Sequence, residues 1–400
     1  MIVKKITKKI FYILLNVLFI FLLFLKNFIN IKIFLIDYSA IGAYSQFDFN
    51  LIINKLNNKK SINFVFSSTN WGMVNYDWLD LWKNNYIIIK KYTLLNLVLN
   101  KFSKKNLYKS LFYQPIKFNK IYNNTQLLNE FIYDLNNQKT KNVSFTNEQI
   151  NLGNKLLKEY DLSKYICIHA RDNLFRNNLN VKKNWDYHNY RDSNINNYVE
   201  GTLRLSEMGY KIVRMGYKVK DIDKKYLNNK NLINYSKSNL RSNFNDIYLS
   251  AKCHFFVVSN TGVSSFAEAF RKPIVYVNYT HIKGIYNTCT VTGGLIIFKK
   301  FFSNKLNRYL KLSEIVKLDI SKGYQQMLIE QKIDLIENSP DEIYNACIEM
   351  EERLNKTWKE SEKHKSDQRK IWQILKLGNI YNNKFIISSY FLEKNNFFLN

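Results

Sequence analysis

The sequence predicts an α/β protein built from two doubly wound domains, each a parallel sheet with helices on both faces. Short apolar runs that fit buried strands alternate with stretches of helical periodicity, and this alternation occurs twice along the chain. An irregular, Asn-rich join over about 114–144 separates the two series. A length of 400 residues also suits two domains.

The first series follows a basic and then apolar N-terminus. Its predicted strands lie at 31–36, 62–66 and 86–89, with helical patterns at 47–56 and 94–112. Each strand is followed by a polar or Gly-containing stretch, as in Asp37–Ala43 after the first strand. These features predict one parallel sheet between residues 31 and 145.

The second series begins with a helix at Thr146, where Gln149 completes a capping-box pattern. A later helix is expected to begin at Asp192 or Ser193 and to end at Gly209. The predicted strands of this series lie at 165–168, 210–213, 232–233, 255–258 and 274–277. Ser339 and Pro340 then predict the start of a long helix, and the stretch from 385 to 400 carries no motif.

The N-terminus combines four lysines within residues 4–9 with the apolar stretch Ile10–Leu25. That stretch is slightly short for a membrane span of about 20 residues. No small-residue cleavage site follows it, which disfavours a removable signal peptide. An uncleaved anchor and an interfacial helix remain open, and we expect the bulk of the chain on the cytoplasmic side of the membrane.

The composition limits the other classes of function. The net charge of +28 suits nucleic acid, an anionic membrane surface or an acidic substrate. An AT-rich coding sequence would also enrich Lys, Asn, Ile, Tyr and Phe, and the lysines are spread along the chain without an Arg-rich block or an RNA-binding motif. We therefore expect no nucleic-acid binding. The four cysteines lie far apart and form no zinc-ligand spacing, so no metal site is expected.

The segment Cys253–Pro273 is the first candidate for a binding site. An apolar run that fits a strand leads into Ser259-Asn260-Thr261-Gly262, and helical spacing follows from Val263 to Arg271. A strand, a polar loop and a helix N-terminus together favour an anion. A diphosphate is the obvious ligand, although an ordinary strand–turn–helix remains the simpler interpretation.

Other predicted strand ends of the second series carry cationic groups. One strand leads into His169-Ala170-Arg171-Asp172, and another leads into Arg214-Met215-Gly216. Arginine suits a diphosphate because its fork bonds two oxygens. Ligands of doubly wound sheets bind beyond the carboxyl ends of strands, so Arg171, Arg214 and the loop at Thr261 predict one diphosphate site. Neither GxxxxGK[ST] nor GxGxxG occurs, which argues against a kinase, an ATPase and a simple dehydrogenase.

Three strings of this half resemble a bacterial family of glycosyltransferases encoded in surface-carbohydrate gene clusters. They are ICIHARDNLF (166–175), NYRDSNINNYVEGTLRLSEMGYKIVRMG (189–216) and FFVVSNTGVSSFAEAFRKPIVYVN (255–278). The chain is more distantly similar to GT-B enzymes of the fucosyltransferase type. The resemblance implies a GT-B fold of two Rossmann-like domains facing a cleft, a nucleotide-sugar donor, and neither an essential metal nor a cofactor. Val263 departs from the family, which usually has a small residue there.

Roles for the site residues follow as a hypothesis. Arg171 and Arg214 would neutralise the leaving diphosphate, and the groups at Asn260, Thr261, Gly262, Ser264 and Ser265 would hold its oxygens. Glu268 is a candidate for the ribose hydroxyls, or else a solvated helix position. His169 and Asp172 are candidate general bases, and a structural hydrogen bond is the alternative for His169. Gly42 would let the first loop approach the cleft.

The predicted organisation is therefore an N-terminal anchor or interfacial helix (1–30), an acceptor domain (31–145), a donor domain (146–335), C-terminal helices (336–375) and a tail (376–400). The predicted function is metal-independent transfer of a sugar from a nucleotide-sugar to a growing surface glycan or a lipid-linked acceptor, with a membrane surface as a further partner. A non-catalytic, membrane-associated protein that binds carbohydrate or nucleotide is the alternative.

Overall fold

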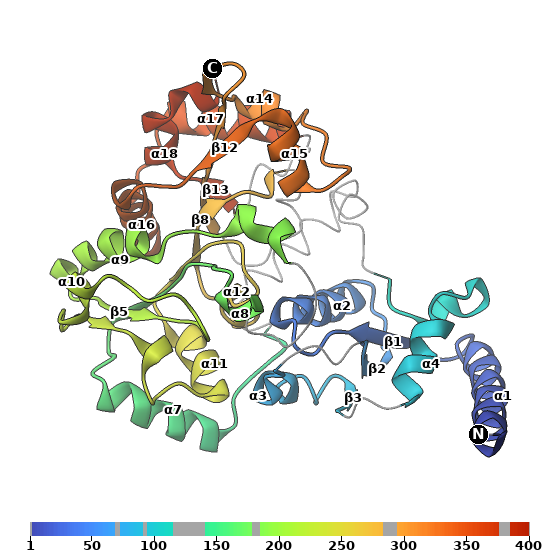
Figure 1. The fold of residues 1–400 in the computed structure, drawn as a ribbon. Coiled ribbons are helices and arrows are strands. Elements are labelled where there is room, and N and C mark those ends of the chain that lie inside the picture. The colour runs from blue at the N-terminus through green and yellow to red at the C-terminus, as the bar shows by residue number, and fades with distance from the viewer. Residues whose placement is uncertain are drawn as a thin grey trace. The chain divides into compact units, whose positions relative to one another are not determined.

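The computed structural model describes residues 2–68, 73–90, 94–114, 141–177, 185–282, 294–375 and 385–399. The chain divides into two compact units, residues 1–117 and 118–400 (Figure 1). Most of the Asn-rich join, together with Cys289, lies outside the described residues. Both units are mixed α/β structures with parallel sheets, as the alternating pattern predicts.

The first unit contains a three-stranded parallel sheet in the order β1-β2-β3. The strands are β1 (Ile31–Ile36), β2 (Ile62–Ser67) and β3 (Ile87–Ile89). The helical elements are α1 (Ile2–Leu25), η1 (Ile41–Tyr44), α2 (Ser45–Leu56), α3 (Tyr76–Asp80), α4 (Leu94–Phe102) and η2 (Asn106–Leu111). The helical pattern over 94–112 is thus split in two, at the polar stretch Ser103–Asn106.

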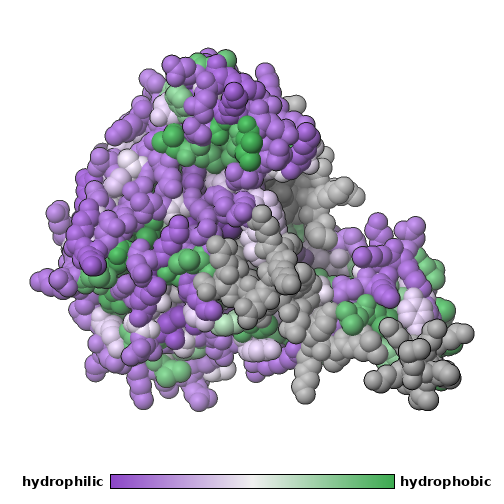
Figure 2. All heavy atoms as spheres, viewed as in Figure 1, coloured by the Kyte–Doolittle hydropathy of each residue, from purple (hydrophilic) through white to green (hydrophobic). Residues whose placement is uncertain are grey.

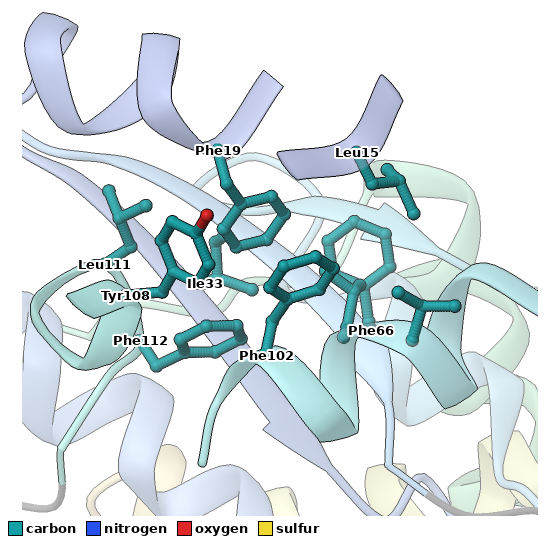
Figure 3. Close-up of a cluster of buried hydrophobic side chains, with 10 residues drawn as sticks. Leu15, Phe19, Ile33, Phe66, Phe102, Tyr108, Leu111 and Phe112 are labelled. Carbon is teal, nitrogen blue, oxygen red and sulfur yellow. The ribbon is translucent and has the colours of Figure 1, made fainter. Parts of the chain in front are cut away.

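Neighbouring residues of β1 serve the two faces of this sheet, because side chains alternate along a strand. On one face Phe34 meets Phe47 of α2 edge-on, with ring centroids 5.5 Å apart. On the other face Ile33 and Phe66 belong to a buried cluster with Phe19 of α1 and Phe102 of α4 (Figure 3). The N-terminal helix is therefore part of the core of this unit.

The second unit is organised around a seven-stranded parallel sheet in the order β13-β9-β8-β7-β4-β5-β6. Its strands are β4 (Tyr165–His169), β5 (Lys211–Arg214), β6 (Leu232–Ile233), β7 (Phe256–Val258), β8 (Ile274–Tyr279), β9 (Gly294–Phe298) and β13 (Phe385–Ile387). A small antiparallel sheet, β11-β10-β12, consists of β10 (Lys300–Ser303), β11 (Arg308–Tyr309) and β12 (Ile333–Ile336). The five strands predicted for this half are all present.

Helices surround the larger sheet (Figure 1). They are α7 (Asn147–Glu159), α8 (Leu174–Asn177), η4 (Asp186–Arg191), α9 (Ile195–Leu203), η5 (Arg204–Met208), α10 (Lys224–Leu227), η6 (Tyr235–Lys237), α11 (Asn243–Lys252), α12 (Ser264–Ala269), α14 (Leu312–Ile315), α15 (Tyr324–Gln331), α16 (Pro340–Leu354), α17 (Glu362–Leu375), α18 (Ser389–Lys394) and η8 (Asn396–Phe398). The long helix α16 packs on α9 and α18.

Most of the predicted helix ends are present, and one begins at a different residue. The capping box at Thr146 and Gln149 is present, and Ser339 caps α16 with Glu342 in the same way. Gly209 follows η5 with a φ of 82°, the left-handed conformation that favours glycine. The N-cap of α9, however, is Asn194 rather than Asp192 or Ser193. Asp192 instead forms an ion pair with Arg171.

Residues 385–399, which the sequence leaves as part of a motif-free tail, belong to the second unit. Ile386 of β13 pairs with Leu295 of β9, and Phe391 and Phe398 are buried beside Phe298. The strand adds an edge to the main sheet. Its partner strand lies about ninety residues earlier in the chain, so no local sequence pattern predicts this pairing.

The apolar N-terminal stretch forms α1, as its pattern predicts. Among the helices of the described ranges, none combines the length and the apolar character needed to cross a bilayer.

Candidate functional site

The strand order of the second unit defines a switch point between β4 and β7. From β4 the chain builds outward through β5 to β6, and it then returns to place β7 on the opposite side of β4. In doubly wound sheets ligands bind at this position, outside the carboxyl ends of the strands. The residues after β4 and β7 are therefore the first candidates for a ligand site.

Backbone and side-chain bonds join these two strand ends. The Ser259 N–H donates to the carbonyl oxygen of His169 at 3.3 Å. The Arg171 N–H in turn donates to Ser259 Oγ at 2.9 Å. The hydroxyl of Ser259 thus continues the β4–β7 pairing past the ends of the strands and fixes the relative position of their loops.

His169 is buried at the end of β4, and its Nδ1 lies 3.2 Å from the carbonyl oxygen of Met215. Burial lowers the pKa of the imidazole to about 4. The ring is therefore neutral at pH 7, and Nδ1–H donates to Met215. This is the structural hydrogen bond that the sequence left open as an alternative to a general base.

Arg171 is also buried, and its guanidinium already has protein partners. It forms an ion pair with Asp192 and donates to the His188 carbonyl oxygen at 3.1 Å. Its own carbonyl oxygen accepts the Ser193 N–H at 2.9 Å. Arg171 thus connects the end of β4 to the segment between η4 and α9.

Arg214 has a similar structural environment at the end of β5. Only 1% of it is exposed, and burial lowers its pKa to about 10. The guanidinium donates to Ser236 Oγ at 2.8 Å, to Asn234 Oδ1 at 3.1 Å and to the Lys220 carbonyl oxygen. It therefore holds together the loops after β5 and β6.

Asp172 is only partly buried, but both of its carboxylate oxygens accept backbone N–H groups. Oδ1 accepts from Leu174 and Oδ2 from Lys220, each at 2.9 Å. The side chain links the start of α8 to the loop after β5.

The loop after β7 contributes Asn260, which is buried, and Thr261 and Gly262, which are partly exposed. Asn260 Nδ2 lies 3.0 Å from His281 Nδ1, and His281 Nε2 lies 2.6 Å from the Tyr190 hydroxyl. Burial lowers the pKa of His281 to about 4. This neutral histidine thus connects the β7 loop with η4.

The helix after this loop, α12, is shorter than the predicted 263–271. Its first N–H groups bond within a tight turn, from Ser264 to Thr261 and from Ser265 to Gly262. Ser264 and Ser265 are buried. Ser264 Oγ lies 2.7 Å from Glu268 Oε1, so these groups do not form the open helix N-terminus that the sequence suggested.

Glu268 is buried rather than solvated. Its Oε1 accepts the Tyr276 hydroxyl at 2.8 Å as well as the Ser264 hydroxyl. These bonds connect α12 to β8. The carboxylate therefore has a structural role within the unit, and it offers less to a ribose than the sequence-based hypothesis assumed.

Arg191 lies at the end of η4. It is half-buried, and its buried Nε has no hydrogen-bond partner among the described residues. Burial lowers its pKa, and its charge in turn lowers the pKa of His281. Arg191 directly follows Tyr190 in η4, and the Tyr190 hydroxyl contacts the ring that connects to Asn260. The only sequence signal for it was its place in the string Asn189-Tyr190-Arg191.

A cavity of about 450 Å³ lies beside the same part of the unit. Its walls come from η4, α15, β12 and the junction of β9 and β10. They include Asn189, Tyr190, Lys299, Gln325, Leu328, Ile329, Lys332, Ile333, Asp334 and Leu335. Lys299 is buried, and burial lowers the pKa of its ammonium group. Tyr190 both lines the cavity and contacts His281.

The last predicted site residue, Gly42, belongs to the first unit. It lies in η1, and its carbonyl oxygen accepts the Ser45 hydroxyl at 2.8 Å. Its role at a cleft stays a prediction. Within the described ranges, no group of three or more His, Cys, Asp or Glu side chains could hold a metal ion.

Comparison with known proteins gives only remote likenesses. No family model and no curated protein matches the chain. Among solved structures, E. coli ADP-heptose lipopolysaccharide heptosyltransferase II is 12% identical, with a TM-score of 0.40, over 81% of this chain and 100% of that one. A glycosyltransferase of family 9 from Veillonella parvula is 10% identical, with a TM-score of 0.39, over 68% and 86%. A UDP-N-acetylglucosamine 2-epimerase is 12% identical, with a TM-score of 0.30, over 83% and 97%. Likenesses at this level assign no activity to the chain.

Proposed function

We propose that the protein is a GT-B-type glycosyltransferase that moves a sugar from a nucleotide-sugar donor to a growing surface glycan or lipid-linked acceptor. The observation that carries the proposal is the buried Nε of Arg191, which has no hydrogen-bond partner among the described residues. Arg191 ends η4, which contacts the switch-point loop of a seven-stranded parallel sheet through Tyr190 and His281. Parallel sheets of this order bind nucleotides at the switch point. A cation there suits the diphosphate of the donor.

The energetics favour an anion at Arg191. Leaving a buried polar atom without a hydrogen-bond partner is costly, and the buried Nε of Arg191 has none among the described residues. Two phosphate oxygens would satisfy the guanidinium fork in one bidentate contact. The loop Asn260–Gly262, whose Asn260 side chain bonds His281, supplies further polar groups on the same side of the sheet.

Arg171 and Arg214 take a different role in this proposal. Both guanidiniums are buried and have carboxylate, hydroxyl or carbonyl partners. They are positioning residues, because they hold the loops after β4, β5 and β6 in place. Arg191 is the group that would stabilise negative charge on the leaving diphosphate as the bond to the sugar breaks. In this proposal the reaction uses this cationic side chain and needs neither a metal nor a cofactor.

The proton of the acceptor hydroxyl needs a base, and neither sequence candidate is poised for it. Asp172 accepts two backbone N–H groups, and His169 is buried with a pKa of about 4. We therefore give both residues structural roles and leave the base unassigned. Because neither side chain is free to act as a base, the second candidate function also has support, namely a non-catalytic protein that binds nucleotide or carbohydrate.

The proposed acceptor, a surface or lipid-linked glycan, would place the enzyme at a membrane surface. The donor would reach it from the cytoplasm, so we propose the cytoplasmic side of the membrane as the working location.

The test is nucleotide binding by the purified full-length protein. UDP, GDP, CDP, ADP and CMP are screened by thermal shift, and the best ligand is then titrated calorimetrically. We expect one nucleoside diphosphate to stabilise the protein. Arg191→Gln should weaken its binding about 10- to 100-fold, since a hydrogen bond to a charged group contributes about 1.5–3 kcal/mol. Arg308→Gln, which removes an exposed cation distant in sequence, should bind like the parent.

Two results would count against the proposal. One is unchanged affinity in Arg191→Gln with the parent fold intact. The other is a parent protein that responds to no nucleotide. Binding without hydrolysis or transfer, across a panel of nucleotide-sugars and lipid-linked acceptors, would instead favour the non-catalytic binding protein.

A further inference from the structure

The helix α1 is apolar on two opposite sides, and only one of them is used in folding. Leu15 and Phe19 are buried against the first unit (Figure 3). The Phe19 ring stacks on Phe102 with centroids 4.8 Å apart and meets Tyr108 edge-on at 5.3 Å. These contacts account for one side of the helix. The other side has no comparable role in the core.

The outer side of α1 presents a continuous apolar stripe to solvent. Eight side chains between Ile10 and Phe24 are exposed, from 46% for Leu18 to 63% for Leu14. They are Ile10, Ile13, Leu14, Val17, Leu18, Ile20, Phe21 and Phe24. Spacings of three and four residues align them along one face, and Phe28 extends the stripe with 73% exposure. Figure 2 shows apolar residues at the surface of this end of the first unit. A patch of this kind marks an interaction surface.

The charges around the stripe are of one sign. Residues 4–9 contain four lysines, and the first acidic residue of the chain is Asp37. The segment 94–114 adds Lys101, Lys104, Lys105 and Lys109, all exposed, and contains no acidic residue. This segment lies against α1, since the Lys105 ammonium is 5.0 Å from the centroid of the Tyr12 ring.

We propose that the outer face of α1 docks on an anionic lipid bilayer, with the helix lying in the plane of the interface. An apolar stripe beside basic side chains is the pattern of interfacial helices, and the lysines match the anionic headgroups. A spanning orientation would require the Leu15 and Phe19 side to leave the core of the first unit. This inference does not depend on the proposed transfer reaction.

A second copy of the chain is the competing occupant of the stripe. Self-association through this face would bring two sets of lysines together, with no acidic residue in the flanking segments to compensate. Like charges placed face to face oppose such a contact. The charge pattern therefore selects the lipid surface over a dimer.

The experiment is co-sedimentation of the full-length protein with vesicles. One set is made of phosphatidylethanolamine and phosphatidylglycerol, and the other of phosphatidylcholine alone. We expect at least tenfold stronger partitioning onto the anionic vesicles, weakened by salt. The double variant Phe21→Ser, Phe24→Ser should reduce this partitioning at least tenfold. Both side chains are exposed, so the melting temperature should stay that of the parent.

Matched variants separate the contribution of the apolar stripe from that of the lysines. Leu306→Ser removes an equally exposed apolar side chain from the second unit, where it should leave partitioning unchanged. Lys101→Gln with Lys104→Gln and Lys109→Gln should weaken binding to the anionic vesicles only. Equal partitioning of the parent and the Phe21/Phe24 variant would overturn the proposal. The proposal would also be overturned if the parent did not bind vesicles but formed a dimer, and if the Phe21/Phe24 variant were a monomer. These outcomes do not depend on whether the protein binds a nucleotide, so this test is separate from the test of the proposed function.

Discussion

Gly216 shows how one residue shapes the strand ends of the second unit. Its φ of 126° is a conformation that side-chain-bearing residues rarely adopt. A Cβ at this position would lie 2.8 Å from Val219 Cγ1 and 2.9 Å from His169 Nδ1. The glycine of the string Arg214-Met215-Gly216 therefore lets the chain pass beside the buried imidazole. This close approach explains why a glycine stands at residue 216.

For the site residues, the sequence predicts which strand ends carry them but not which side chains they bond. It located the strand ends that carry Arg171, Arg214 and Asn260, because strands and their polar ends are local signals. It did not foresee that Arg171 pairs with Asp192 or that Ser236 accepts from Arg214. Those partners lie some twenty residues away, and only the fold brings them together. For the same reason the lack of a partner for Arg191 Nε could not be foreseen.

The low pKa of buried His169 predicts how the free energy of unfolding depends on pH. His169 has a pKa of about 4 in the fold, against about 6.5 in an unfolded chain. Between pH 6.5 and 4 the unfolded chain binds the proton more readily, so the free energy of unfolding falls as the pH falls through this window. At pH 5 the loss is about 2 kcal/mol relative to neutral pH.

His169→Asn tests this, because the asparagine amide can still donate to the Met215 carbonyl oxygen. Urea unfolding at pH 7 and pH 5 should show a smaller loss of stability for the variant than for the parent. In the parent, histidine-selective NMR should show that the resonances of His169 and His281 do not titrate down to pH 5. An imidazole that titrates near pH 6.5 at residue 169 would contradict the prediction.

At the scale of elements, local rules gave reliable results where a helix or strand carries its own signals. Ser339 and Pro340 predicted the start of α16, and the structure adds a capping box between Ser339 and Glu342. The strands β9 and β13 were not predicted. Val275 and Leu295 pair across a segment of twenty residues, and β13 joins from the far end of the chain. Such pairings are tertiary, and periodicity alone does not reveal them.

Gly201 sets the distance between α9 and α16. A Cβ added to it would lie 2.6 Å from the Pro340 carbonyl oxygen, which is backbone and cannot move aside on its own. Gly201→Ala should therefore destabilise the second unit by about 1–3 kcal/mol, although alanine is the better helix former by about 1 kcal/mol. Chemical unfolding measures the change. Glu207→Ala, at an exposed position of the neighbouring η5, should stay within about 0.5 kcal/mol of the parent. A stabilised Gly201→Ala would mean that the two helices separate without cost.

At the scale of the whole molecule, the positive charge is not evenly divided. Residues 1–117 contain 17 lysines and only four acidic residues, Asp37, Asp48, Asp77 and Asp80. A compositional bias toward lysine accounts for part of the net charge. It does not by itself explain why acidic residues are scarce in the unit that carries the apolar stripe of α1. The alternating pattern predicted two domains that meet at residues 145 and 146, and the compact units divide at residues 117 and 118. The use of α1 as a core helix was not predicted.

The two units are therefore expected to carry separable properties. Phe19→Ala should cost the first unit about 3–5 kcal/mol, because it removes a buried ring that stacks on Phe102. Phe21→Ala, at a position 53% exposed on the same helix, should change stability little. The folded Phe19→Ala protein should keep the parent's nucleotide affinity, since the proposed donor site lies wholly in the second unit. Conversely, Arg191→Gln should keep the parent's partitioning onto anionic vesicles. Calorimetric unfolding, nucleotide titration and vesicle sedimentation on the same three variants check this separation. A loss of nucleotide affinity in folded Phe19→Ala would show that the donor site also depends on the first unit.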